Sequence, residues 1–98
     1  MAVPAPGLPK AVKPSPFWHV HDYTSNDTKW RKVEFGFTTS HVVVENRSAH
    51  AVEYTFAGPQ QHVERLQPGD AHTLNHKAAT IMWYRLTVAK EEIHIRAW

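Results

Sequence analysis

The histidines are the first candidates for chemistry, because the chain holds eight of them in 98 residues. His19 and His21 have the i, i+2 spacing that places two imidazoles on one face of a β-strand, and such a pair can supply two ligands to a metal ion. Asp22 follows directly and is a candidate third ligand. These residues define the first candidate metal site.

A second pair of histidines, His72 and His76, follows the Pro68-Gly69-Asp70 turn. This segment loosely resembles the second motif of the cupins, which are metal-binding jelly rolls. The first cupin motif needs a glutamate shortly after its histidine pair, and here the next glutamate after His21 is Glu34. The leading interpretation is therefore a protein without a metal or other cofactor, whose histidines hydrogen-bond at the surface or line a subunit interface.

Other catalytic chemistry has little support in the composition. The absence of cysteine excludes a disulfide framework, a thiolate zinc site and a cysteine nucleophile. The four glycines are dispersed, so they form no phosphate-binding loop. The serines lack a nucleophile elbow, and the acidic residues are scattered singly along the chain. We therefore expect that this protein is not an enzyme.

The elements that must position these residues are β-strands. From Trp30 onward, apolar residues alternate with polar ones and are rich in β-branched and aromatic types. Turn signals at Asn46-Arg-Ser-Ala, Ala57-Gly-Pro and Gln67-Pro-Gly-Asp separate the segments, and Pro68-Gly69 predicts a type II turn. The pattern predicts strands at 30–38, 41–46, 51–57, 61–66, 71–75, 80–89 and 92–98, and an eighth at 17–24.

Seven or eight short strands predict an all-β fold, a single antiparallel β-sandwich of jelly-roll or immunoglobulin-like kind. In the strand 80–89, Trp83 and Tyr84 point to opposite faces, and both faces are largely apolar. Either the strand is central and covered on both sides, or one face is buried on assembly. Trp83, Tyr84 and Trp98 are therefore the candidate interface residues of the sandwich.

Residues 1–16 form a separate segment, because they contain five of the seven prolines. Proline fixes φ and removes a hydrogen-bond donor, so we expect an extended arm before a sandwich domain at 17–98. The arm is either a solvated terminus or a clamp on a neighbouring subunit. The candidate partner-binding residues of the clamp are Val3, Pro4, Leu8, Lys10, Val12, Lys13, Phe17 and Trp18.

The net charge of +2 resides in this arm. Lys10 and Lys13 have no acidic neighbour there, and removing these two from eleven Lys and Arg leaves nine, against nine Asp and Glu, in residues 17–98. A neutral body offers no basic groove, which argues against nucleic-acid binding. Prolines interrupt the N-terminal residues and no long apolar run follows, so we expect neither a signal peptide nor a membrane span.

Five short motifs in residues 41–98 resemble those of short virion proteins of tailed bacteriophages. In those proteins a strand ending in Asn, a Phe-x-Gly hairpin, a Leu-x-Pro-Gly-acid turn, an Ile-x-Trp-x-Arg strand and a terminal Trp recur. The corresponding segments here are Val42-Val-Val-Glu-Asn46, Val52-Glu-Tyr-Thr-Phe56-Ala-Gly58, Arg65-Leu-Gln-Pro-Gly-Asp70, Ile81-Met-Trp-Tyr-Arg85 and Ile95-Arg-Ala-Trp98.

The resemblance implies a decoration or cement protein that binds the major capsid protein, acts as a homo-oligomer, most simply a trimer, and lies on the capsid surface of a virion assembled in the host cytoplasm. A tail or neck component is an alternative within the same resemblance. A carbohydrate- or receptor-binding sandwich that uses exposed aromatic residues is a second alternative, and a cupin-like metal-binding protein is a third.

Overall fold

The computed structural model describes residues 17–98, and these residues form an all-β structure of eight antiparallel strands. The predicted fold class is therefore confirmed, with an eighth strand in the 17–24 segment. No helix that could cross a membrane occurs within residues 17–98. The strands are β1 (His19–Tyr23), β2 (Arg31–Glu34), β3 (His41–Asn46), β4 (Val52–Thr55), β5 (Glu64–Leu66), β6 (Ala71–Asn75), β7 (Ile81–Leu86) and β8 (Ile93–Ala97).

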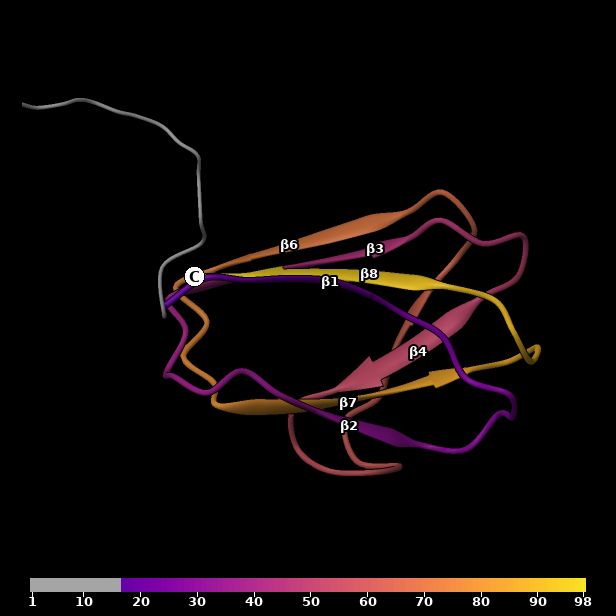
Figure 1. Ribbon diagram of the computed structural model, residues 1–98, viewed down its shortest axis with the longest axis horizontal. Helices are drawn as coiled ribbons and strands as arrows, with labels where there is room; N and C mark the ends of the chain where they lie inside the picture. The colour runs from indigo at the N-terminus through magenta and orange to yellow at the C-terminus, as the bar shows by residue number, and fades with distance from the viewer. Residues whose placement is uncertain (1–16) are drawn as a thin grey trace, which may run out of the picture.

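The strands form two four-stranded sheets, which face each other as two layers (Figure 1). Sheet A has the order β1-β8-β3-β6, and sheet B has the order β2-β7-β4-β5. The first strand thus pairs with the eighth, the second with the seventh, the third with the sixth and the fourth with the fifth. The chain thus follows the path of one long antiparallel hairpin that is folded over on itself. The β3–β8 and β4–β7 pairs complete the two sheets, and this strand order is that of a jelly roll.

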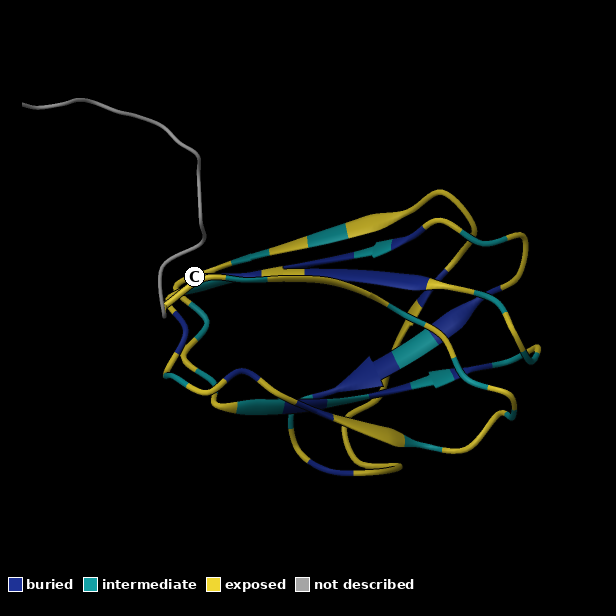
Figure 2. Ribbon diagram, in the orientation of Figure 1, coloured by how far each residue is buried: buried dark blue, intermediate teal, exposed yellow. Residues whose placement is uncertain are grey.

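The core lies between the two sheets and follows the period-two pattern of the sequence. Every second side chain of β8 points inward, and Ile93, Ile95 and Ala97 are fully buried. From the opposite layer, Met82 and Leu86 of β7 meet them. Figure 2 shows buried segments along β3, β8 and β4, whereas β6 and the connecting loops are largely exposed. Burying each Ile, Leu or Met side chain of this core stabilises the fold by about 1.5–3 kcal/mol.

Several strands are shorter than the sequence predicts, for local reasons. The strand expected at 30–38 ends at Glu34, because Gly36 has φ +83° and turns the chain. The strand expected at 51–57 ends at Thr55, whose hydroxyl accepts a hydrogen bond from the Ala57 amide (3.0 Å). The strand expected at 80–89 ends at Leu86, and the Thr87 hydroxyl donates to the Ala51 carbonyl (2.5 Å).

The turn between β5 and β6 has the predicted type II geometry. Gly69 has φ +84°, and the Asp70 amide donates to the Gln67 carbonyl at 3.0 Å. The Gly69 amide also donates to the Asn46 carbonyl at 3.0 Å. The turn is thereby attached to the end of β3.

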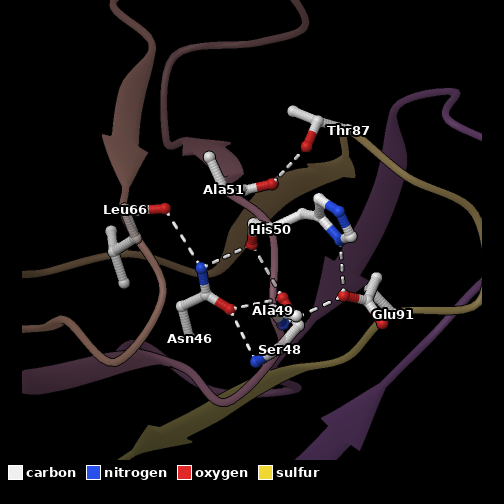
Figure 3. A network of polar contacts seen from close by, with 8 residues as sticks. All are labelled: Asn46, Ser48, Ala49, His50, Ala51, Leu66, Thr87 and Glu91. Carbon is white, nitrogen blue, oxygen red and sulfur yellow. Dashed lines mark hydrogen bonds and ion pairs between the residues drawn. The ribbon is translucent and has the colours of Figure 1, made fainter.

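Asn46 holds this end of the sandwich together (Figure 3). Its side chain is 1% exposed, and its amide group donates to the His50 carbonyl at 2.9 Å and to the Leu66 carbonyl at 3.1 Å. Its side-chain oxygen accepts from the Ser48 amide at 2.9 Å and from the Ser48 hydroxyl at 2.7 Å. One buried side chain thus fixes the β3–β4 loop to the end of β5, since every polar group of the amide is satisfied.

Glu91 fixes the same loop from the other side (Figure 3). Its carboxylate accepts hydrogen bonds from the Ala49 amide and the His50 ring nitrogen Nδ1, both at 3.0 Å. Both hydrogen bonds lower the pKa of Glu91, and the one from the His50 side chain has the larger effect. The β3–β4 loop is therefore joined to both the β5–β6 and the β7–β8 connections.

Candidate functional site: an aromatic row at one end of sheet A

Four aromatic rings lie side by side across one end of sheet A. Trp18 stacks on Trp98 with ring centroids 5.7 Å apart and an angle of 23° between the planes. Trp98 lies 5.4 Å from His41, and His41 lies 5.5 Å from His76. We call Trp18, Trp98, His41 and His76 the aromatic row.

The order of the strands explains this row. Trp18 precedes β1, Trp98 follows β8, His41 begins β3 and His76 follows β6, so the rings occur in the order of sheet A, β1-β8-β3-β6. Adjacent strands are ~4.8 Å apart, so the row is about 14 Å long. Two main-chain hydrogen bonds join Trp98 to His41. The His41 amide donates to the Trp98 carbonyl (2.9 Å), and the Trp98 amide donates to the His41 carbonyl (3.1 Å).

The row is open to solvent at its β1 side. Trp18 is 46% exposed and Trp98 is 39% exposed, and Phe17, which packs edge-on against Phe37 at 6.0 Å, is 66% exposed. Figure 1 shows the C-terminus beside the start of β1, so the two tryptophans come from opposite ends of the described chain. Exposed tryptophan and phenylalanine side chains held by a rigid sheet are typical anchors of protein interfaces.

His41 also contributes a buried polar atom to the row. Its Nδ1 atom is buried and has no hydrogen-bond partner among the residues that the structure describes. A buried nitrogen without a partner costs free energy, since it has lost its hydrogen bonds to water.

The sequence identified part of this surface. It singled out Phe17, Trp18 and Trp98, and the structure brings all three to one end of the molecule. It missed the roles of His41 and His76, because their proximity to Trp98 depends on pairing between strands that are far apart in the sequence. The remaining arm candidates, Val3, Pro4, Leu8, Lys10, Val12 and Lys13, lie outside the described residues.

Trp83 and Tyr84 point to opposite faces of β7, as the alternation predicts. Tyr84 is 3% exposed and belongs to the core, where its ring lies 5.5 Å from Tyr23. Its place inside the sandwich corrects its candidacy as an interface residue, since no partner can reach a buried ring. Trp83 is half-buried on the outer face of sheet B, opposite Lys32 of β2 and Thr55 of β4.

The four histidines proposed as metal ligands do not form one site. His19 and His21 lie on β1, whereas His72 lies on β6, at the opposite edge of sheet A. His76 is in the aromatic row. Within residues 17–98, no group of three or more His, Cys, Asp or Glu side chains is placed to hold a metal ion.

His19 and His21 instead belong to an aromatic cluster at the β1 edge. The His19 ring nitrogen Nε2 and the Tyr23 hydroxyl are 2.9 Å apart, and the ring packs edge-on against Phe35 at 5.2 Å. Burial lowers the pKa of His19, and the nearby His21 lowers it further. Asp22 forms a hydrogen bond with His94, which lowers the pKa of Asp22.

The lowered pKa of His19 predicts a pH dependence of stability. The unfolded chain binds a proton near the ordinary pKa of ~6.5, whereas the folded chain binds it only at lower pH, so His19 stabilises the fold above this range and loses that contribution as the pH falls through it. We expect the melting temperature of the His19→Gln variant to change less between pH 7.5 and pH 5.5 than that of the wild type. A His62→Gln variant, altered in an exposed loop, is the control, and an unchanged pH dependence in His19→Gln would contradict the assignment.

A cleft of about 550 Å³ opens on the opposite side of the sandwich, between the edges of β5 and β6. Tyr54 and His72 meet in it, with the Tyr54 hydroxyl 2.7 Å from the His72 Nδ1 atom. Burial raises the pKa of Tyr54 to about 12, and the charge of Glu64 adds to the increase. The cleft is lined by Tyr54, Phe56, Ala57, His62, Glu64, His72, Leu74 and Lys77.

The chain matches no model of a known protein family, and it matches no curated protein sequence.

Proposed function

We propose that this protein is a structural component of a bacteriophage virion, a decoration protein that binds the major capsid protein on the outside of the shell. The observation that carries the proposal is the aromatic row, which is exposed and lies next to the residues that lead into the N-terminal arm. The arm and the row would together form one docking surface.

Three features support this proposal. The jelly roll is a fold of viral capsid domains, although it also serves lectins and cupins. Trp18 and Trp98 present large apolar surfaces that a partner would bury. Lys10 and Lys13 give the arm a positive charge, which suits acidic patches on a shell subunit.

Docking of this kind would stabilise the shell through linkage. A protein that binds the assembled shell and not its separated subunits shifts the equilibrium toward the assembled state. The tryptophans would supply most of the binding energy, since a few central aromatic side chains dominate typical interfaces. The lysines would chiefly accelerate association.

The arm is tested by deletion of residues 1–16. We expect the remaining chain to keep its circular dichroism spectrum and its melting temperature, because the described core is formed by residues 33–97. Its affinity for isolated shells should fall by at least about tenfold, as clamp contacts are lost. Undiminished binding of the truncated, folded protein would contradict the role of the arm.

The number of copies per particle separates this function from a tail or neck role. A decoration protein would be present in purified virions in proportion to the shell subunits, whereas a tail or neck component would be present in a few copies only. Absence from purified virions would exclude both.

The exposed tryptophans also favour a second candidate, a glycan-binding sandwich at the particle surface, because sugar rings stack on such side chains. A glycan array distinguishes the two functions. Binding of a defined glycan that is lost in a Trp18→Ala variant would support this second function, and a silent array together with tight shell binding would dismiss it.

A further inference from the structure

One of the four edge strands of the sandwich differs from the others. The two sheets leave β1, β6, β2 and β5 at their edges. Edge strands expose unpaired main-chain groups, and proteins usually protect them with charges or keep them very short. Here β2 carries three charged residues, β5 has only three residues, and β1 contains Asp22, whereas β6 (Ala-His-Thr-Leu-Asn) has five residues and none that is acidic, lysine, arginine or proline.

The main-chain groups of β6 that have no strand partner within residues 17–98 can be identified from its pairing with β3. The Asn46 amide donates to the Asp70 carbonyl at 2.9 Å, so residue 70 faces β3. In an antiparallel ladder alternate residues bond to the same neighbour, and the residues between them bond to the other side. The N–H and C=O groups of Ala71, Thr73 and Asn75 therefore point away from β3, along the open edge.

We propose that two copies of this chain join through β6, antiparallel about a two-fold axis at Thr73, and form one continuous eight-stranded sheet. In this register Thr73 faces the partner's Thr73, and Ala71 faces the partner's Asn75. The residues with free N–H and C=O groups thus meet one another, and opposed threonines are a favourable cross-strand pair.

The residues that flank β6 are complementary in the same register. Asp70 precedes the strand, and His76 and Lys77 follow it. Antiparallel pairing of two copies brings the acidic residue of each to the basic residues of the other. Because the interface is two-fold symmetric, this pairing of opposite charges occurs twice.

The pairing also completes the cleft between β5 and β6. His72 and Leu74 are half-buried and line this cleft, which lies between the edges of β5 and β6. In the proposed register of the two β6 strands, the partner's Leu74 lies beside His72 on the same face of the enlarged sheet. Each cleft then receives an apolar side chain from the other subunit, so the proposal accounts for an open cavity next to an uncharged edge.

The test is the mass of the full-length protein in solution. We expect sedimentation equilibrium at about 100 µM to give a dimer, which is twice the 11.2 kDa of one chain. In the Thr73→Pro variant the β3–β6 ladder keeps its hydrogen bonds, since the Thr73 amide points away from β3. The two N–H groups at the axis are lost, and the dissociation constant should rise by about 10- to 100-fold.

Two further variants control this result. Thr73→Lys places like charges opposite each other at the axis and should likewise raise the dissociation constant. Thr73→Val keeps the shape and β-propensity of the residue and should remain dimeric. Circular dichroism and melting temperature establish that each variant is folded. A wild-type monomer, a wild-type trimer, or a dimer that the Pro and Lys variants leave unchanged would each overturn the proposal, and none of these outcomes depends on capsid binding.

Discussion

Replacing Asn46 by aspartate is expected to lower the free energy of unfolding by about 3–5 kcal/mol, the range for an unpaired buried charge. The side chains have the same shape, so packing is conserved. The donor nitrogen becomes a charged oxygen that faces the carbonyls of Leu66 and His50, which are now 3.1 and 2.9 Å from the amide nitrogen. Chemical denaturation at pH 7 measures the loss, which corresponds to a fall in melting temperature of more than about 10 °C.

The matched control is Asn26→Asp, the same change at an exposed position of the β1–β2 loop. Exposed substitutions of this kind change stability by less than about 0.5 kcal/mol. The deficit of Asn46→Asp should also shrink as the pH falls toward 4, because protonation removes the buried charge and restores one donor. A loss below about 1 kcal/mol at pH 7 would show that the network in Figure 3 does not hold this end of the sandwich.

Asn46 shows what the local sequence pattern can predict and what it cannot. The sequence Asn46-Arg-Ser-Ala predicts a turn, and the structure has one, because a short polar side chain satisfies nearby main-chain groups. Its bond to the Leu66 carbonyl spans 20 residues and depends on how the strands pair. Similarly, alternation predicts the seven strands from Trp30 onward, with an eighth expected at 17–24, whereas strand order decides between the jelly-roll and immunoglobulin-like alternatives.

The candidate site depends on strand order even more strongly. The spacing of His19 and His21 correctly predicts that both side chains share one face of a strand. It cannot show that His72 lies on the opposite edge of sheet A, which separates the candidate metal ligands. The aromatic row has the same origin, since Trp18 meets Trp98 only because β1 pairs with β8. Composition identifies such residues, but long-range pairing determines which of them meet.

Trp98→Ala is expected to weaken binding to isolated shells by about 30- to 1,000-fold, the loss of about 2–4 kcal/mol typical of a central aromatic anchor. Trp98 contacts both Trp18 and His41, so its removal breaks the aromatic row in the middle. The fold should persist, because the main-chain bonds between residues 98 and 41 do not involve the side chain. Affinity is measured with shells that lack this protein.

Trp83→Ala is the matched control for this prediction, because it makes the same change on the outer face of sheet B. If the aromatic row is the docking surface, Trp83→Ala leaves shell affinity within about threefold of the wild type, as expected for a residue outside the interface. If instead Trp83→Ala abolishes binding and Trp98→Ala does not, the shell contacts sheet B, and the row has another role. Both variants must retain the wild-type circular dichroism spectrum, so that lost binding reports the surface and not the fold.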